Sequence, residues 1–507
     1  MIRKIDGEDR SSEERKAPVH LEAGEIQGII ITAYPHLPFS RYLFLHIDDP
    51  SLARQWLGNL APRITHADWK PSPTNIIKKP HNAMNIAFTS DGVLALGVDA
   101  TVVNTFPEEF CQGMGEPARA RRLGDNGASD PKAWELGSPS AGAGQQIHIL
   151  LILEAPDLTD LNRLTQECRD EMKNNGGVKE INTAEDGHPL PAQKEHFGFH
   201  DGISQPEIEG SPKRGRPSAS CLKAGEFILG YENEYNLLPA TPTVAASQDI
   251  HNNLPQLPTT DSPATGPALK DLGRNGSYLV FRKLYQDVAA FRSFIAASAD
   301  GDADLLAAKL VGRWPSGTSL IQSPERDTPP PDGQDPDNDF VYTQTDPYGY
   351  ICPLGAHVRR ANPRDAMSDR NPADSLHDVR RHRILRRGVP YGEPLDGAGE
   401  AAPTPRGLLF LCVNADIKRQ FEFIQQTWSN NPKFHGLNND RDPLIGDNVE
   451  PGDAIDTLQP RVFTIQRDGV RRRLTGIPRF VTMKGGGYFF LPSIAAIFFL
   501  AGVPRTS

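Results

Sequence analysis

A short segment flanked by glycines carries the first candidate for acid–base chemistry. Residues 196–206 read His-Phe-Gly-Phe-His-Asp-Gly-Ile-Ser-Gln-Pro, so Asp201 stands between Gly198 and Gly202. Asp-Gly in isolation is most often a tight turn in which the aspartate is a turn-former. Alternatively, the two glycines let the backbone approach a flat ligand, and Asp201 projects into the cavity above it. The segment by itself leaves both interpretations open.

A second segment places a histidine between apolar residues and cations. His357 follows Cys-Pro-Leu-Gly-Ala and precedes Val-Arg-Arg-Ala-Asn-Pro-Arg in residues 352–364. A single histidine among fourteen is more often structural than a metal ligand. A haem, however, needs a neutral imidazole for its iron and side chains such as Arg359 and Asn362 near its propionates. We therefore consider His357 a hypothetical haem ligand, with a structural histidine as the alternative.

Arginines alternate with apolar residues in a third segment. Residues 380–392 read Arg-Arg-His-Arg-Ile-Leu-Arg-Arg-Gly-Val-Pro-Tyr-Gly, which is typical of a strand with one charged face. The simplest interpretation is an edge strand with a basic face. The functional interpretation puts Arg386 inside a cavity, facing Asp201 across a small substrate.

The elements around these segments recur in a similar order in both halves of the chain. Apolar runs predict strands at residues 42–47, 146–153, 277–282 and 407–413, and residues 26–32 also read as strand-like. Apolar residues at helical spacing predict helices at residues 158–172 and 417–428. In the second helix, one face would carry Ile417, Phe421, Ile424 and Trp428. The sequence therefore predicts an α+β fold of two similar domains, each an antiparallel sheet covered by helices.

A proline-rich stretch separates the two halves. Residues 239–269 contain six prolines and no apolar period, which is typical of a loop or linker. We therefore predict an N-terminal domain over residues 20–238, a linker over residues 239–269 and a C-terminal domain over residues 270–507. A second such loop is expected at residues 323–339.

Composition excludes several other classes of protein. The chain of 507 residues has a net charge of −10, so it lacks the basic field expected of a nucleic-acid or anionic-membrane binder. The most apolar stretch, residues 488–503, is interrupted by Pro492 and predicts a buried final strand and helix, because it is too short to span a bilayer. No apolar core of a secretory signal follows Met1, and no CxxC pair occurs among the five cysteines. We therefore expect free thiols and a cytoplasmic location.

Taken together, the three segments resemble those of the dye-decolorising peroxidase family. Residues 198–202 are similar to that family's GxxDG signature, residues 352–364 to its proximal-histidine segment, and residues 384–392 to its distal-arginine segment. Further stretches match at residues 276–284, 440–446 and 486–493. The resemblance runs from about residue 25 to the end, and the long loops look like the larger subgroup of the family.

The resemblance implies a fold, a cofactor and an activity. It implies two ferredoxin-like domains and one haem b per chain, held mainly by the C-terminal domain. The implied enzyme uses hydrogen peroxide to oxidise dyes, phenolics and similar bulky reductants through compound I. His357 would be the axial iron ligand, Asp201 the acid–base residue, and Arg386 the residue that stabilises charge as the O–O bond breaks. The resemblance further implies cofactor contacts by Gly198, Phe199, Gly202, Arg359, Asn362, Leu408 and Phe410, the last two forming a wall over the haem.

Some of the implied roles stay open between neighbouring residues. Asp442 is the candidate for the carboxylate that accepts the Nδ1–H of His357, but Asp440 and Asp447 lie close by in sequence. Trp428 and Tyr348 are candidates for an electron relay to dyes too bulky to reach the haem. A core position on its helix face is the alternative for Trp428.

The identity of the predicted base leads to an expected pH dependence. An unperturbed aspartate has a pKa of about 3.9, so a mechanism that uses Asp201 as a base should work best in acid unless burial raises that value. We therefore expect an acidic optimum for dye oxidation in a pH–rate profile. An optimum above about pH 8 would count against Asp201 in this role.

Two competing functions remain compatible with the sequence. One is a haem-binding or haem-handling protein with little peroxidase turnover, although such a carrier needs neither Asp201 nor Arg386. The other is an α+β binding module without haem, in which the three segments are turns and edges. The natural reductant and the choice between monomer and homodimer stay open.

Overall fold

The computed structural model describes residues 19–68, 79–211, 220–258, 268–331, 338–367, 371–395, 405–447 and 461–505. The prediction about a signal sequence falls on the first residues of the chain and lies outside the described residues. Part of the predicted linker, residues 259–267, also lies outside them.

The first half of the chain folds into a β-α-β-β-α-β unit. Its strands form an antiparallel sheet in the order β2-β3-β1-β4. Every residue of β3 is buried, which explains why residues 149–153 are a continuous apolar run in the sequence. The elements are β1 (Phe39–Ile47), α2 (Pro50–Leu60), β2 (Ala83–Phe88), β3 (Ile149–Ala155), α7 (Leu158–Asn175) and β4 (Val178–Gly187). Four short helices join β2 to β3: α3 (Ser90–Ala95), α4 (Ala100–Val103), α5 (Glu108–Gln112) and α6 (Pro117–Leu123).

The second half repeats this strand order. Its sheet runs β10-β12-β9-β15, and β11 also pairs with β12. The elements are β9 (Ser277–Gln286), α8 (Val288–Ser298), β10 (Leu385–Arg386), β11 (Val389–Tyr391), β12 (Gly407–Asn414), two π-helical segments, η8 (Lys418–Glu422) and η9 (Ile424–Ser429), and β15 (Val481–Leu491). The prediction of two ferredoxin-like domains with antiparallel sheets is confirmed.

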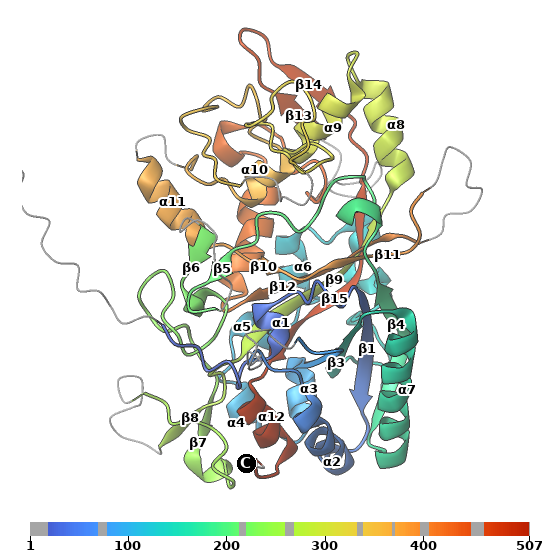
Figure 1. Cartoon of the computed structure of the whole chain (residues 1–507), viewed down its shortest axis with the longest axis vertical. Helices are drawn as coiled ribbons and strands as arrows, with labels where there is room; N and C mark the ends of the chain where they lie inside the picture. The colour runs from blue at the N-terminus through green and yellow to red at the C-terminus, as the bar shows by residue number, and fades with distance from the viewer. Residues whose placement is uncertain are drawn as a thin grey trace, which may run out of the picture.

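The two sheets join into one curved sheet. β15 pairs with β2 at Phe490 and Phe88. At the other side, the backbone N–H of His188, just after β4, donates to the carbonyl of Pro390 in β11 at 3.0 Å. The sheets of the two halves therefore contact each other at both of their edges. Their strands cross the middle of the molecule (Figure 1).

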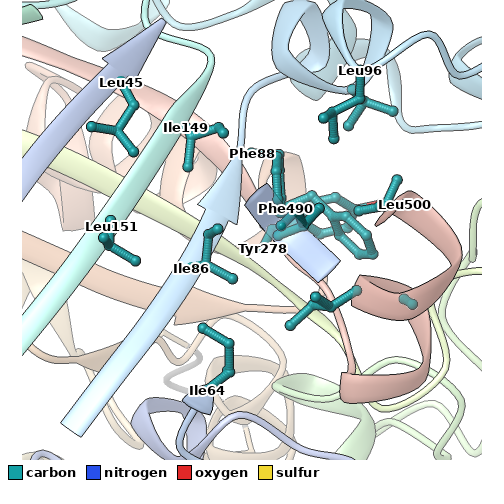
Figure 2. Close-up of a cluster of buried hydrophobic side chains, with 14 of the residues drawn as sticks. Leu45, Ile64, Ile86, Phe88, Leu96, Ile149, Leu151, Tyr278, Phe490 and Leu500 are labelled. Carbon is teal, nitrogen blue, oxygen red and sulfur yellow. The ribbon is translucent and has the colours of Figure 1, made fainter. Parts of the chain in front are cut away.

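One apolar core spans the junction between the halves. Figure 2 shows Phe88 of β2 beside Phe490 of β15 and Tyr278 of β9, with Leu500 of α12 (Ile494–Ala501) next to them. All four of these residues are almost completely buried. The apolar C-terminal stretch is thus a buried final strand and helix, as predicted. In the part of the chain that the structure describes, no helix has the length and apolar character needed to span a bilayer.

Further elements decorate the sheet at both ends. The end that carries the second half's additional elements lies opposite α12 (Figure 1). It contains α9 (Ala303–Val311), α10 (His357–Ala361), α11 (Pro372–Arg380), β13 (Val462–Ile465) and β14 (Arg472–Thr475). Elsewhere lie α1 (Gly28–Ile31) and the pairs β5 (Glu207–Ile208) with β6 (Cys221–Leu222) and β7 (Thr243–Ala245) with β8 (Leu269–Asp271). The predicted linker, residues 239–269, thus contains the short strand β7, which pairs with β8 at the end of the linker. The domain boundaries stay a prediction.

Local structure differs from the sequence prediction in three places. Residues 26–32 contain the short helix α1 and no strand, because the side chain of Gln27 donates to the carbonyls of Ile86 and Pro492 and holds the segment against the sheet. Residues 417–428 are helical but largely in the π form, with N–H to carbonyl bonds five residues apart, as from Glu422 to Ile417. In the basic segment, residues 380–392, α11 ends at Arg380, and only the two short strands β10 and β11 are formed, in place of one continuous strand.

A buried carboxylate in β3 gives the fold a pH dependence of its own. Glu154 is buried, and its Oε2 accepts no hydrogen bond within the described part of the chain. Burial raises its pKa to about 8, and the charge of Arg387 offsets only part of this effect. Because the folded-state pKa lies above that of the unfolded chain, the protonated group favours folding at low pH. This contribution is lost as the pH rises toward 8.

We therefore expect Glu154→Gln to gain stability relative to the unsubstituted protein as the pH rises from 5 to 8. In that window each pH unit removes at most about 1.4 kcal/mol from the unsubstituted protein and leaves the glutamine variant unaffected. Thermal unfolding at several pH values measures the difference. Glu108→Gln, at a side chain that is 68% exposed, is the control and should show no such trend. A constant difference between Glu154→Gln and the unsubstituted protein at all pH values would contradict the expectation.

Candidate active site

A cavity of about 300 Å³ brings together predicted site residues that are far apart in the sequence. Its lining includes Asp201 from the glycine-flanked segment, His357 from α10 and Arg386 from β10. Phe199, Asn362, Leu408 and Phe410 from the predicted set also line it. Most of the lining comes from the second half of the chain, and a smaller part comes from residues 123–129 and 195–204.

The sheet of the second half forms one wall of the cavity. Alternate residues of a strand point to the same face, and in β9 these are Arg282, Leu284 and Gln286. Leu408 and Phe410 do the same in β12. Apolar side chains from elsewhere complete the lining: Val311, Val358, Phe421, Ile424, Leu444 and Ile445. A largely apolar wall with a few polar groups is the usual composition of a cofactor site.

A buried aspartate fixes the orientation of His357. The Nδ1 of His357 lies 2.9 Å from Oδ2 of Asp442, whose side chain is fully buried. Oδ1 of the same carboxylate accepts the backbone N–H groups of Leu444 at 2.9 Å and Ile445 at 3.0 Å. Because an ionised carboxylate only accepts, His357 donates through Nδ1, and its Nε2 is left to bind a metal ion.

The neighbouring aspartates have other partners. Asp440 accepts the backbone N–H of Thr464 at 2.8 Å, and Asp447 forms an ion pair with Arg441. Of the three aspartates considered from the sequence, Asp442 is therefore the one in contact with His357.

The charges of His357 and Asp442 stabilise each other. Burial lowers the pKa of His357, but the charge and hydrogen bond of Asp442 outweigh it, so the net pKa is raised. Burial raises the pKa of Asp442, and the charge and hydrogen bond of His357 bring it below its ordinary value. Asp442 is thus held in its ionised form, in contact with the imidazole of His357.

Asp201 and Arg386 form an ion pair in the same cavity. The Nη1 of Arg386 donates to Oδ1 of Asp201 at 3.1 Å, and the side chains are 36% and 30% exposed. Oδ1 also accepts the backbone N–H of Gly202 at 2.6 Å. Within the described residues no hydrogen bond reaches Oδ2, so this oxygen is available to exchange a proton with a ligand. The Nη2 of Arg386 donates to the carbonyl of Ile203 at 2.9 Å, which holds the guanidinium beside Asp201.

The glycines on either side of Asp201 are required by backbone conformation. Gly198 has φ 101° and Gly202 has φ 80°, values that other residues rarely adopt. A Cβ added at either position would meet no protein atom within 4 Å, and neither residue is among those that line the cavity. Their role in this structure is to shape the turn that presents Asp201.

Arginines at the cavity wall fit the propionates of a haem. Burial and the charges of neighbouring arginines lower the pKa of Arg313 to about 10 and that of Arg383 to about 9. Arg386 and Arg364 contribute to this mutual repulsion. A bound dianion would relieve it, since arginine binds carboxylates through paired N–H donors. Together with the apolar walls and the free Nε2 of His357, this cationic cluster fits a haem.

Besides Gly198, Gly202 and Asp442, three further predicted site residues lie away from the cavity lining. Arg359 is buried in an ion pair with Asp346 at 3.0 Å and stacks on Tyr342, so its guanidinium is already neutralised and the predicted cofactor contact gains no support. Trp428 is buried in an apolar cluster and contacts His382, with ring centroids 5.3 Å apart. Tyr348 is 67% exposed beside Tyr350.

Sequence reasoning missed several residues that line the cavity. Arg313 lies in no motif, and Arg383 lies in the basic segment 380–392, where Arg386 alone was chosen; only the tertiary structure brings Arg313 and Arg383 together. Phe421 and Ile424 were predicted to share a helix face, and that face could have been assigned to a ligand wall. Glu195 directly precedes the glycine-flanked segment, so its position beside Asp201 was readable from the sequence.

Comparison with known proteins gives consistent matches over most of the chain. The model of the DyP dimeric alpha+beta barrel domain matches residues 25–186. A dye-decolorizing peroxidase of Mycena epipterygia is 30% identical over 499 residues, which cover 90% of this chain and 82% of that protein. Dye-decolorizing peroxidase AauDyP1 of Auricularia auricula-judae is 29% identical over 510 residues, covering 95% of this chain and 87% of that protein.

Solved structures are similar in fold over nearly the whole length. The crystal structure of a fungal DyP-type peroxidase from Auricularia auricula-judae superposes with a TM-score of 0.73 at 28% sequence identity. The match covers 95% of this chain and 100% of that one.

Proposed function

The chain belongs to the dye-decolorising peroxidase family, and from that premise we propose that it is a haem b peroxidase that uses hydrogen peroxide to oxidise dyes and phenolics. The observation that carries this proposal is one cavity lined by His357, which Asp442 orients, and by the ion pair of Asp201 with Arg386. A haem-handling protein with little turnover would have no use for the second pair.

The proposed cofactor site uses groups of the chain in distinct ways. His357 would hold the iron through Nε2, and Asp442 would keep the imidazole oriented and electron-rich. Arg313 and Arg383 would bind the propionates, and Asn362 lies in the same lining. When bound, haem supplies the iron chemistry that accepts oxidising equivalents from peroxide and passes them to a reductant.

Asp201 and Arg386 would handle the protons and charge of peroxide. Oδ2 of Asp201 takes the proton from one peroxide oxygen and returns it to the other, which leaves as water. Arg386 donates hydrogen bonds toward the leaving oxygen and stabilises the charge that develops there. Its bond to the carbonyl of Ile203 keeps the guanidinium in place during this exchange.

The cavity wall limits which reductants reach the site. Leu408 and Phe410 line the same cavity as Asp201, and we propose that these side chains admit peroxide and exclude a bulky dye. We propose that large dyes give up electrons at the surface. A cytoplasmic location also stays a proposal, which is supported by the five free cysteines.

Spectra and turnover of the purified holoprotein test the proposal. A Soret band is expected with about one haem per chain, and addition of peroxide should change the spectrum within milliseconds to seconds and be followed by oxidation of a phenol. A protein that binds haem but leaves peroxide and phenol unchanged would be a carrier. A protein with no Soret band after haem reconstitution would contradict the proposal altogether.

The proposed relay is tested by substituting its two aromatic candidates separately. If Trp428 carries the electron, Trp428→Phe should lower turnover of a large dye at least about tenfold and leave turnover of a small phenol within about twofold. Tyr348→Phe should have this effect if the exposed tyrosine is the point of contact. Steady-state kinetics with both substrates provide the measurement. Equal large-dye turnover in both variants and the unsubstituted protein would remove these two residues from the relay.

A further inference from the structure

The segment that carries Asp201 adopts a strained backbone and depends on its contacts. Gln193 and Ser204, on either side of Asp201, have φ 54° and 64°. Residues other than glycine stay in this left-handed region only where the surrounding structure fixes them. The carbonyl of Gln193 accepts the backbone N–H of Asp201 at 3.0 Å. The position of Asp201 is therefore set by whatever holds residues 193–204.

The side chain of Glu195 binds backbone N–H groups of the segment that precedes Asp201. Oε1 of Glu195 accepts the backbone N–H of Phe199 at 3.0 Å, and Oε2 accepts that of Phe197 at 2.9 Å. The backbone of Glu195 adds bonds to Gly198 and Phe199, each of 2.9 Å. The side chain is half-buried, and it is among the residues that line the cavity. These hydrogen bonds hold residues 195–199 as a compact loop, and Phe199 at its end lies two residues before Asp201.

The same carboxylate anchors the loop to the sheet of the second half. The Nε2 of Gln286, at the end of β9, donates to Oε2 of Glu195 at 2.7 Å. Because a carboxylate only accepts, this bond fixes which end of the Gln286 amide faces Glu195. Gln286 is buried, and its backbone N–H donates to the carbonyl of Arg406 at 2.9 Å, next to β12. Glu195 thus connects the Asp201 segment to the rigid wall of the cavity.

The site holds Glu195 in spite of an electrostatic cost. Removal from water raises its pKa, the three N–H donors lower it, and the nearby charge of Asp201 raises it further, with a net increase. Two carboxylates close together in a cavity are unfavourable unless donors compensate them. The donors that compensate Glu195 are the ones that fix the loop.

We propose that Glu195 is a positioning residue for the reaction with peroxide. It acts through Asp201 by holding the segment 195–201 against β9, and it does not itself contact the reacting oxygens. This inference rests on the proposed function, in which Asp201 exchanges a proton with peroxide. Displacement of a proton-transfer group by about 1 Å is enough to slow a reaction about 100-fold.

The test compares Glu195→Gln with the double variant Glu195→Gln/Gln286→Glu. The single change puts an amide N–H₂ where the carboxylate accepted N–H groups, so donors face donors. The double variant returns an acceptor to the pair by placing the carboxylate on residue 286. For Glu195→Gln, kcat/KM for peroxide should fall about 10- to 100-fold, and kcat/KM for a small phenol should stay within about twofold. The double variant should recover a substantial part of the loss.

Hydrogen exchange provides a measurement that does not depend on turnover. In the holoprotein, amides of residues 195–204 should exchange faster in Glu195→Gln than in the unsubstituted protein, and more slowly again in the double variant. Glu109→Gln is the matched control, because Glu109 is also a buried glutamate with a raised pKa, and it is not among the residues that line the cavity. It should change neither the peroxide step nor exchange in residues 195–204.

The outcomes separate this inference from the proposed function. The unsubstituted holoprotein is measured first, and failure to react with peroxide would overturn the proposed function itself. If it reacts and Glu195→Gln reacts equally fast, the inference about Glu195 is overturned. An equal fall of kcat/KM for peroxide and phenol, or no rescue in the double variant, would make Glu195 a structural residue only and would also overturn it.

Discussion

Arg386→Leu should retain haem and react with peroxide about 100- to 1,000-fold more slowly than the unsubstituted protein. Arg386 contacts Asp201 through Nη1 and the carbonyl of Ile203 through Nη2, so its guanidinium is fixed where negative charge would develop on peroxide. Leucine fills similar space without a donor or a charge. The loss should therefore appear in the peroxide step and leave haem binding intact, since His357 is unchanged.

Stopped-flow mixing of the holoprotein with peroxide measures this step directly. Arg163→Leu, which removes an arginine from the exposed ion pair with Asp160 on α7, is the matched control and should react at the unsubstituted rate. Asp201→Asn should slow the same step about 100- to 10,000-fold, because asparagine keeps the shape and the acceptor at Oδ1 but cannot take up a proton. A full rate in Arg386→Leu would refute the proposed proton and charge handling.

His357→Ala should lose haem, and this is the second large effect. The imidazole is held by Asp442 with Nε2 left for the iron, and no other histidine except His200 is among the residues that line the cavity. Loss of an orienting partner alone weakens metal binding about 10- to 100-fold, so loss of the ligand should weaken haem retention by at least about 100-fold. Asp442→Asn should fall between this variant and the unsubstituted protein.

The ratio of Soret to protein absorbance after purification and haem titration of the apoprotein measure this loss. His81→Ala is the matched control, because His81 also pairs with an aspartate, Asp160, at 2.8 Å, but on the surface. It should bind haem as the unsubstituted protein does. If His357→Ala retained haem with unchanged affinity, another residue would be the ligand, and the assignment of His357 would be wrong.

Helices and strands whose formation depends on residues close in sequence could be predicted from the sequence. The apolar run before Asp157 is β3, and Asp157 is the residue that caps α7 by accepting from the backbone N–H of Asp160. The strands around residues 42–47, 277–282 and 407–413 lie where predicted, because period and apolar content are local properties. The recurrence of element order in both halves correctly indicated two similar α+β domains with antiparallel sheets.

Local pattern was misleading where long-range contacts compete with it. Gln27 holds residues 28–31 as a short helix against β2 and β15, although three consecutive isoleucines favour a strand. The face shared by Phe421 and Ile424 was predicted at the α-helical period, yet these residues lie in π-helical segments, and both line the cavity.

From the sequence, residues were predicted to carry chemistry, and the tertiary structure shows which of these residues share one cavity. Asp201, His357 and Arg386 stand out through the composition of their immediate neighbours, which is visible without a structure. Other features depend on distances between residues that are remote in sequence. Among these features are the contact of Asp442, and not of Asp440 or Asp447, with His357, and the position of Arg359 away from the cavity. The contact of Glu195 with Gln286 is a third. Short-range spacing fixes the direction of a side chain within its own strand or helix, but only the packing of the two halves fixes which side chains share one cavity.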